Sequence, residues 1–261
     1  MVKSSLIFIL LVVSIELSAQ SVSTIKNNST NTSVLNSDLP QLQTRYLEKI
    51  YFTSVTATNE LINGREYLPY YWRSGTNPLL FVNRNRTSTL FFRDMEIRNL
   101  SLQYDTYLDV VVYTDNTRTV NGQLARIALN RDNIKGFNLY FDYDSLKFRL
   151  FRFPAKYSDK MKDGFYEVAY DGKSQFLIKH RSSLYNKEGL DKYDYAPENY
   201  IFSGDSWVKI SSKKSLMKVF GSKEKEMSAA IRNSKIKVQK ASKGQLVELL
   251  KYFDNSDKPV N

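Results

Sequence analysis

Apolar and polar residues alternate in short runs from about Leu39 onward, and these runs are rich in aromatic and β-branched residues. Turn-forming residues interrupt them roughly every eight to twelve positions, which is typical of antiparallel strands. The pattern predicts strands near 87–93, 96–104, 108–113, 123–129, 134–141, 145–153, 164–170, 173–181, 199–203 and 206–211. Because such short connections join antiparallel neighbours, we expect a mainly β meander that forms a roll, a sandwich or a partial barrel.

Five clusters of turn-forming residues separate these strands. They are Thr114-Asp115-Asn116, Asn130-Arg131-Asp132-Asn133, Asp142-Tyr143-Asp144, Asp171-Gly172 and Ser203-Gly204-Asp205. Asp171-Gly172 is the strongest hairpin signal, because a two-residue type I′ turn needs positive φ at both positions. A hairpin closed at this turn would place Phe165 opposite Ile178, Glu167 opposite Phe176, and Asp163 opposite His180.

The hydrophobic period changes after Ser211 from that of strands to that of helices. Four apolar residues fall on one helical stripe: Leu246, Leu249, Leu250 and Phe253. Ser242 and Gln245 form a capping box in front of this stripe. Weaker stripes predict a helix over 216–220, stopped by Gly221, and another around Met227. We therefore expect an α+β protein with two to three short C-terminal helices packed on the sheet.

The N-terminus has the layout of a secretory signal peptide. Lys3 precedes an apolar run from Leu6 to Val13, and the small residues Ser18 and Ala19 follow. This run is shorter than the roughly 20 residues that a membrane helix needs, so we expect no transmembrane span. Cleavage after Ala19 would export the protein to the periplasm or the extracellular space of a bacterium.

These patterns together predict five segments. Their ranges are 1–19 for the signal peptide, 20–38 for a disordered polar linker, 39–211 for the β-rich domain, 212–254 for the helical segment packed on the sheet, and 255–261 for a flexible tail.

Composition excludes several kinds of chemistry. The chain has no cysteine and a single histidine, His180. Thiol nucleophiles, disulfides and metal sites that need two imidazoles are therefore absent, and we expect no cofactor and no metal. A Ser-His-Asp triad would have to use His180, but no serine lies in a nucleophile-elbow motif. An ion pair with Asp163 is the preferred interpretation of this histidine.

Paired carboxylates keep one enzymatic alternative open, because a glycan hydrolase needs only two suitably spaced acids. The candidate pairs are Asp105 with Asp109, Asp142 with Asp144, and Asp191 with Asp194. All of them lie in or beside predicted turns, where aspartate commonly accepts hydrogen bonds from nearby backbone amides. A ligand pocket lined by at least two converging acids would favour the hydrolase, and a convex protein without such a pocket would favour a non-enzymatic binding or structural role, which we prefer.

Positive charge is concentrated in the C-terminal part of the chain. The protein has a formal net charge of +11, and residues 209–251 hold twelve cationic side chains against three glutamates. A solvated polar face explains this composition most simply. The alternative is attraction to an anionic envelope surface or an acidic glycan. Nucleic acid is not an expected partner, because an exported protein seldom meets it and no recognition motif is present.

One aromatic and basic cluster is the candidate ligand-binding site. Its residues are Tyr67, Tyr70, Tyr71, Trp72, Arg73, Arg84 and Arg86. Aromatic rings flanked by guanidinium groups are suited to stacking on sugars or holding anionic groups. Ordinary packing of the rings is the simpler explanation, since large rings are the main stabilising resource of a sheet without disulfides.

Several stretches resemble a family of secreted bacterial proteins without known activity. They are Asn63-Gly64-Arg65-Glu66-Tyr67, Leu102-Gln103-Tyr104-Asp105, Gly164-Phe165-Tyr166-Glu167-Val168, Ser212-Lys213-Lys214-Ser215-Leu216 and Leu250-Lys251-Tyr252-Phe253. The resemblance covers most of the mature chain. It implies a signal peptide, a β-rich body and a helical C-terminus, and it transfers no catalytic residue.

Overall fold

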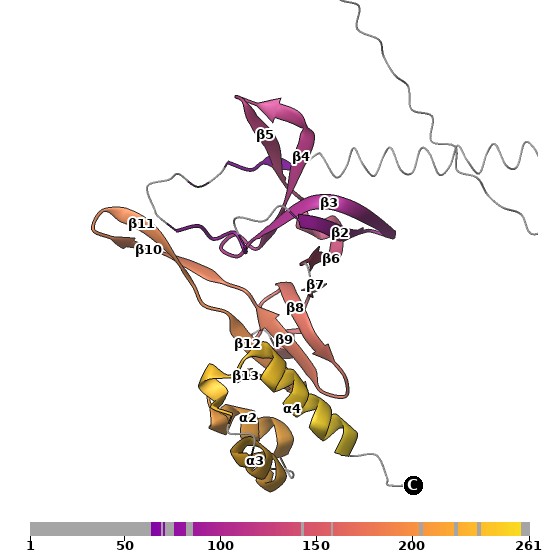
Figure 1. Ribbon diagram of the computed structural model, residues 1–261, viewed down its shortest axis with the longest axis vertical. Coiled ribbons are helices and arrows are strands. Elements are labelled where there is room, and N and C mark those ends of the chain that lie inside the picture. The colour runs from indigo at the N-terminus through magenta and orange to yellow at the C-terminus, as the bar shows by residue number, and fades with distance from the viewer. Residues whose placement is uncertain are drawn as a thin grey trace, which may run out of the picture. The chain divides into compact units, whose positions relative to one another are not determined.

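The structure is a computed structural model that describes residues 64–68, 70, 76–81, 86–141, 144–157, 159–203, 206–221, 224–233 and 236–256. Eleven of its strands form one antiparallel sheet in the order β1-β5-β4-β3-β2-β6-β7-β8-β9-β12-β13 (Figure 1). The predicted signal peptide and linker lie outside the described residues.

Ten strands of the main sheet correspond to the ten predicted strands, although β4 extends to Val120 where the prediction ends at residue 113. The main sheet contains β1 (Arg65–Glu66), β2 (Arg86–Phe92), β3 (Met95–Asp105), β4 (Val110–Val120), β5 (Gln123–Ala128), β6 (Ile134–Tyr140), β7 (Ser145–Phe151), β8 (Gly164–Asp171), β9 (Gln175–Lys179), β12 (Glu198–Ser203) and β13 (Ser206–Ile210). A separate two-stranded sheet contains β10 (Ser182–Lys187) and β11 (Leu190–Tyr195). Most strands pair with their neighbours in the chain, which confirms the predicted antiparallel meander.

The first half of the sheet curls around an aromatic core. Tyr104 on β3 contacts the rings of Phe137 on β6, Phe148 on β7 and Phe165 on β8, with centroids 5.2–6.2 Å apart. Strands β3 and β8 are four positions apart in the sheet, which would separate them by about 19 Å if the sheet were flat. The sheet must therefore bend strongly, and this bend brings the β3–β4 turn close to β8.

The second half of the sheet buries both of its faces. Phe176 and Ile178 on β9 pack with the C-terminal helices, whereas Leu177 between them packs on the other face with Tyr166 and Trp207. This is the alternation expected of a strand covered on both sides. The helical face and the Trp207 face thus lie on opposite sides of β8, β9, β12 and β13.

Three helices cover the first of these faces, as the hydrophobic stripes predict. They are α2 (Lys213–Phe220), α3 (Glu224–Asn233) and α4 (Lys243–Ser256). The predicted capping box is present: the Ser242 backbone N–H donates to Gln245, and the Gln245 N–H donates to the Ser242 hydroxyl. In the described part of the chain, no helix is both long and apolar enough to cross a membrane.

The predicted register of the β8–β9 hairpin is wrong. Glu167 lies opposite Ile178 rather than Phe176, and Asp171 pairs with Gln175 across a longer turn. The reason is Asp254 of α4, whose carboxylate accepts hydrogen bonds from the Ser174 N–H and hydroxyl and from the Tyr170 hydroxyl. Gly172 does not adopt positive φ, so no type I′ turn forms at Asp171-Gly172.

One further turn prediction is wrong, and one hairpin was not predicted. The 114–116 cluster is not a turn but part of β4, where Asp115 accepts hydrogen bonds from the Thr117 N–H and hydroxyl beside an irregularity in the β4–β5 pairing. The chain turns instead at Asn121-Gly122, where both φ angles are positive, at 51° and 76°. A similar turn at Glu188-Gly189 closes the β10–β11 hairpin, which the sequence pattern did not reveal.

Candidate functional site

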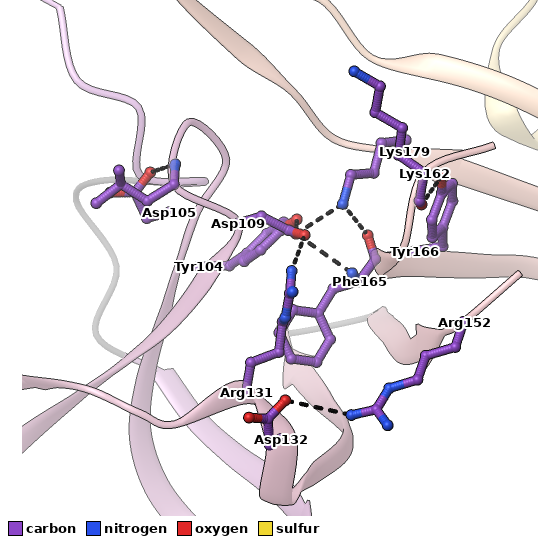
Figure 2. Close-up of polar contacts among 11 residues, drawn as sticks. Tyr104, Asp105, Asp109, Arg131, Asp132, Arg152, Lys162, Phe165, Tyr166 and Lys179 are labelled. Atoms are coloured by element: carbon purple, nitrogen blue, oxygen red, sulfur yellow. Dashed lines mark hydrogen bonds and ion pairs between the residues drawn. The ribbon is translucent and has the colours of Figure 1, made fainter. Parts of the chain in front are cut away.

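The β3–β4 turn places Asp109 at the centre of the candidate site. Asp105, the last residue of β3, uses Oδ1 to accept the backbone N–H groups of Tyr107 and Leu108 at 2.8 and 2.9 Å. Asp109 then adopts φ of 58°, a left-handed conformation that aspartate tolerates better than most residues. The local sequence therefore forms a tight turn that directs the Asp109 carboxylate toward β8 and β9 (Figure 2).

Asp109 is held by groups from several strands. Its carboxylate accepts hydrogen bonds from the Tyr104 hydroxyl at 2.6 Å and from Lys179 Nζ at 2.8 Å, and Arg131 lies 3.5 Å away (Figure 2). Lys179 also donates to the Phe165 carbonyl at 3.0 Å. The side chains of Lys179 and Asp109 are only 12% and 19% exposed. This ion pair therefore ties the β3–β4 turn to β9 in a partly desolvated setting.

Burial and the charge of Asp109 shift the pKa of Lys179 in opposite directions. Burial lowers the pKa of the Lys179 ammonium group, and the negative charge of Asp109 opposes that change only in part. Gly164, at φ of 153°, leaves the space for this contact, because a Cβ at that position would collide with the Asp109 carboxylate and with Lys179 Nζ. A side chain at position 164 is thus incompatible with the observed arrangement.

A cavity of about 720 Å³ opens on the Lys179 side of this turn. It lies beside β8, β9, β12 and β13 and also reaches the segment before β8 and helix α2. Its lining residues are Thr106, Tyr107, Asp109, Asp159, Lys160, Lys162, Asp163, Tyr166, Lys179, Arg181, Glu198, Tyr200, Trp207, Val208, Lys209 and Lys218. We call this space the basic cavity, because cationic residues outnumber acidic ones in its lining.

The cationic side chains of the basic cavity fall into two groups. Lys179 and Lys209 are neutralised by ion pairs with Asp109 and Glu198. The other four are exposed and form no ion pair with a carboxylate in the part of the chain described here; they are Lys160, Lys162, Arg181 and Lys218. These four groups supply positive charge that is available to an anionic ligand.

Neither Glu198 nor Asp163, two acidic side chains of the cavity, has the properties of a general acid catalyst. Burial raises the pKa of Glu198, but hydrogen bonds from Lys209 and the Tyr200 hydroxyl outweigh burial, so the pKa lies below its usual value. Asp163 accepts the backbone N–H of Phe153 at 2.8 Å. A lowered pKa favours a carboxylate that accepts hydrogen bonds over one that donates a proton at neutral pH.

Four aromatic residues line the basic cavity. Tyr166, Tyr200 and Trp207 are buried and pack edge to face with neighbouring rings. Tyr107, in the β3–β4 turn, is 41% exposed and contacts the ring of Tyr193. The ring of Tyr107 is therefore the one in this lining that is most accessible to a ligand.

The aromatic and basic cluster predicted as the ligand site is described only in part. The Tyr67 and Tyr70 hydroxyls both donate to Asp105 Oδ2, at 2.8 and 2.6 Å. Burial and then Asp105 raise the pKa values of both phenols, so both remain protonated donors to this acceptor. These two rings support the β3–β4 turn. Tyr71, Trp72, Arg73, Arg84 and the side chain of Arg86 lie outside the described residues.

His180 has a different partner from the predicted one. Its Nε2 lies 2.7 Å from the Glu167 carboxylate, and its Nδ1 lies 2.5 Å from the Tyr195 hydroxyl. Glu167 is buried and also accepts a hydrogen bond from Lys243 at the start of α4. The predicted pairing with Asp163 is wrong because the β8–β9 register differs from that of a type I′ hairpin.

Four members of the three predicted carboxylate pairs are bound to partners of their own, namely Asp105, Asp109, Asp144 and Asp191. Asp105 accepts hydrogen bonds from backbone amides of the turn and from two tyrosine hydroxyls, whereas Asp109 forms an ion pair with Lys179. Asp144 accepts the N–H of Ser145, and Asp142 lies outside the described residues. Asp191 accepts the amide of Asn186. Within the described residues, no group of three or more His, Cys, Asp or Glu side chains is placed to hold a metal ion.

Sequence reasoning missed most of the basic cavity. Its lining comes from the β3–β4 turn, the segment before β8, the four strands β8, β9, β12 and β13, and α2, which no local pattern connects. Asp109 was considered only as a partner of Asp105, and Lys218 only as part of the basic C-terminal segment. Comparisons with protein-family models, with curated proteins and with solved structures gave no match. The geometry of the cavity is therefore the basis for assigning a function.

Proposed function

We propose that this chain is an exported, non-enzymatic protein that binds an acidic glycan in the basic cavity. The observation that carries the proposal is a set of four exposed cations that form no ion pair with a carboxylate among the described residues and that line a space of about 720 Å³. Cations placed in a concave site concentrate positive potential there and attract anionic ligands. The signal-peptide layout of residues 1–19 supports export.

The mixed lining favours a sugar over a ligand made mainly of phosphate. A sugar acid carries a negative charge together with several hydroxyl groups, and each hydroxyl can donate a hydrogen bond. Asp159, Asp163 and Glu198 are acceptors in the same cavity as the free cations. A chain of phosphates without hydroxyl donors would be repelled by these carboxylates. The exposed ring of Tyr107 adds a surface on which a sugar ring can stack.

The test is calorimetric titration of the mature protein with oligosaccharides of galacturonic acid. We expect binding that weakens steeply with added salt, and no binding of neutral glucose oligosaccharides of the same length. The variant Lys160→Gln/Lys162→Gln removes two cations of the cavity and should lower affinity by about tenfold or more, because each charge-assisted contact contributes about 1.5–3 kcal/mol before screening.

The control variant is Lys213→Gln/Lys214→Gln, which makes the same change in charge on α2 outside the cavity. Equal losses in the two variants would indicate attraction to the protein's general positive charge, and the cavity proposal would then fail. Vesicles that contain phosphatidylglycerol test the anionic envelope surface in the same way. Vesicle binding that is abolished only by Lys213→Gln/Lys214→Gln would favour that surface over a glycan.

A glycan-acting hydrolase is the second candidate, because Asp109, Asp159, Asp163 and Glu198 line one cavity. Against it, the lowered pKa of Glu198 and the ion pair of Asp109 leave neither acid suited to protonate a leaving group. We expect bound galacturonate oligosaccharides to remain intact during long incubation. Shorter products that disappear in a Glu198→Gln variant would establish the hydrolase instead.

A further inference from the structure

A second cavity lies on the other side of the β3–β4 turn. It has a volume of about 530 Å³, and its lining contains Gly64, Arg65, Leu108, Asp109, Val110, Ala128, Leu129, Asn130 and Arg131. We call it the arginine cavity. Tyr107 lines the basic cavity, Leu108 lines the arginine cavity, and Asp109 lines both. Three consecutive residues of one turn therefore form the wall between two neighbouring spaces.

The arginine cavity is also suited to an anion. Its two guanidinium groups belong to Arg65 on the edge strand β1 and to Arg131, which follows β5. Arg131 lies 3.5 Å from Asp109, a carboxylate that is already bound to Lys179. Arg65 is exposed and has no ion-pair partner within the described residues. A guanidinium group can hold a carboxylate through two parallel hydrogen bonds.

The wall between the cavities has an apolar, accessible tip. Tyr107 is 41% exposed and Leu108 is 52% exposed, and the Asp105 carboxylate fixes both backbone amides. A ligand that lies over this tip would cover apolar surface and keep an anionic group in each cavity. Asp109 sits below the tip with its charge balanced by Lys179, so the wall does not repel such a ligand strongly.

We infer that the ligand is an extended acidic oligosaccharide that crosses the β3–β4 turn, with one sugar carboxylate in the basic cavity and another in the arginine cavity. This inference rests on the proposed function and deepens it. It predicts a dependence on chain length, because a chain long enough to reach both cavities gains the second contact as an intramolecular step. A shorter acid can occupy only one cavity at a time.

The experiment compares the affinities of galacturonic acid disaccharide, tetrasaccharide and octasaccharide for the full mature chain. We expect affinity to rise at least about tenfold between the disaccharide and the octasaccharide. Arg65→Gln should abolish this rise, so that the octasaccharide binds this variant no more than about twofold more tightly than the disaccharide does. Arg232→Gln on α3 makes the same charge change outside both cavities and should leave the rise intact.

The possible results separate the two proposals. If all lengths bind with affinities that grow only in proportion to the number of sugars, the basic cavity acts alone and the two-cavity inference is wrong. The same conclusion follows if Arg65→Gln binds the octasaccharide as well as the Arg232→Gln control does. If no oligosaccharide binds at low salt, the proposed function fails together with the inference. Circular dichroism of each variant checks that the fold is retained.

Discussion

Asp109 and Lys179 form the polar contact on which the geometry of the candidate site depends. Asp109→Asn would leave the Lys179 ammonium group largely buried without a carboxylate partner. We expect the free energy of unfolding to fall by about 3 kcal/mol, near the lower limit for breaking a buried ion pair, because both side chains keep some contact with water. Urea denaturation monitored by tryptophan fluorescence measures the change.

A double variant distinguishes the ion pair from other effects of the substitution. Asp109→Asn combined with Lys179→Met removes both charges, so it should recover much of the lost stability. The Tyr104 hydroxyl can still donate to the amide oxygen of asparagine at position 109. If the double variant is as unstable as the sum of the two single variants, the charges are solvated independently and the ion pair does not fix the turn.

We expect the protonation of Glu167 to lower the free energy of unfolding at acidic pH. Burial raises the pKa of this carboxyl, but the hydrogen bond from His180 and the charge of Lys243 outweigh burial and hold the pKa below its ordinary value of 4.5. A carboxyl whose pKa is lower in the folded state stabilises the protein above the unfolded-state pKa. That contribution is lost as the pH falls from about 4.5 through the folded-state pKa.

The measurement is the free energy of unfolding as a function of pH, for the natural sequence and for Glu167→Gln. We expect the variant to be less stable at neutral pH and to lose less stability on acidification, since it has no proton to gain at position 167. Parallel pH profiles for the two proteins would show that other carboxyl groups account for the acid sensitivity.

At the scale of elements, α4 allows a test of how much the packing of the helices on the sheet contributes to stability. Leu249 is buried between the helices and the sheet, in the same cluster as Leu246, Leu250 and Phe253. Leu249→Ala should lower the free energy of unfolding by roughly 2–5 kcal/mol, through lost burial and the cavity that remains. Chemical denaturation checks this value. Glu248→Ala, at the adjacent exposed position, should change stability by less than about half a kcal/mol.

The helices and most strands follow from local pattern, but the hairpin registers do not. The stripe and capping box of α4 are contained in residues 242–253, so the sequence alone was sufficient to predict them. The β8–β9 turn depends on Asp254, which lies 80 residues beyond Ser174. A contact at that separation leaves no periodic signal, and it overrides the local preference of Asp171-Gly172.

At the scale of the whole molecule, export is the prediction that precedes every proposed function. We expect the mature protein to begin at or near Gln20, because small residues follow the apolar run of residues 6–13 and end at Ala19. Mass spectrometry of the protein purified from the host cell envelope and medium measures the N-terminus. An exported protein that retains residues 1–19 would contradict the cleavage, and a purely cytosolic protein would contradict the export.

The amino-acid sequence by itself was sufficient for the β-rich class, the antiparallel meander, the ten predicted strands and the C-terminal helices. These features depend on alternation with period two or 3.6 and on capping residues a few positions apart. Only the tertiary structure decided where the candidate site lies. The bend of the sheet brings Asp109 to Lys179, and it gathers cations from the segment before β8, from β13 and from α2 around one cavity. These residues come together through packing between strands that are distant in the sequence, and such packing leaves no local sequence pattern.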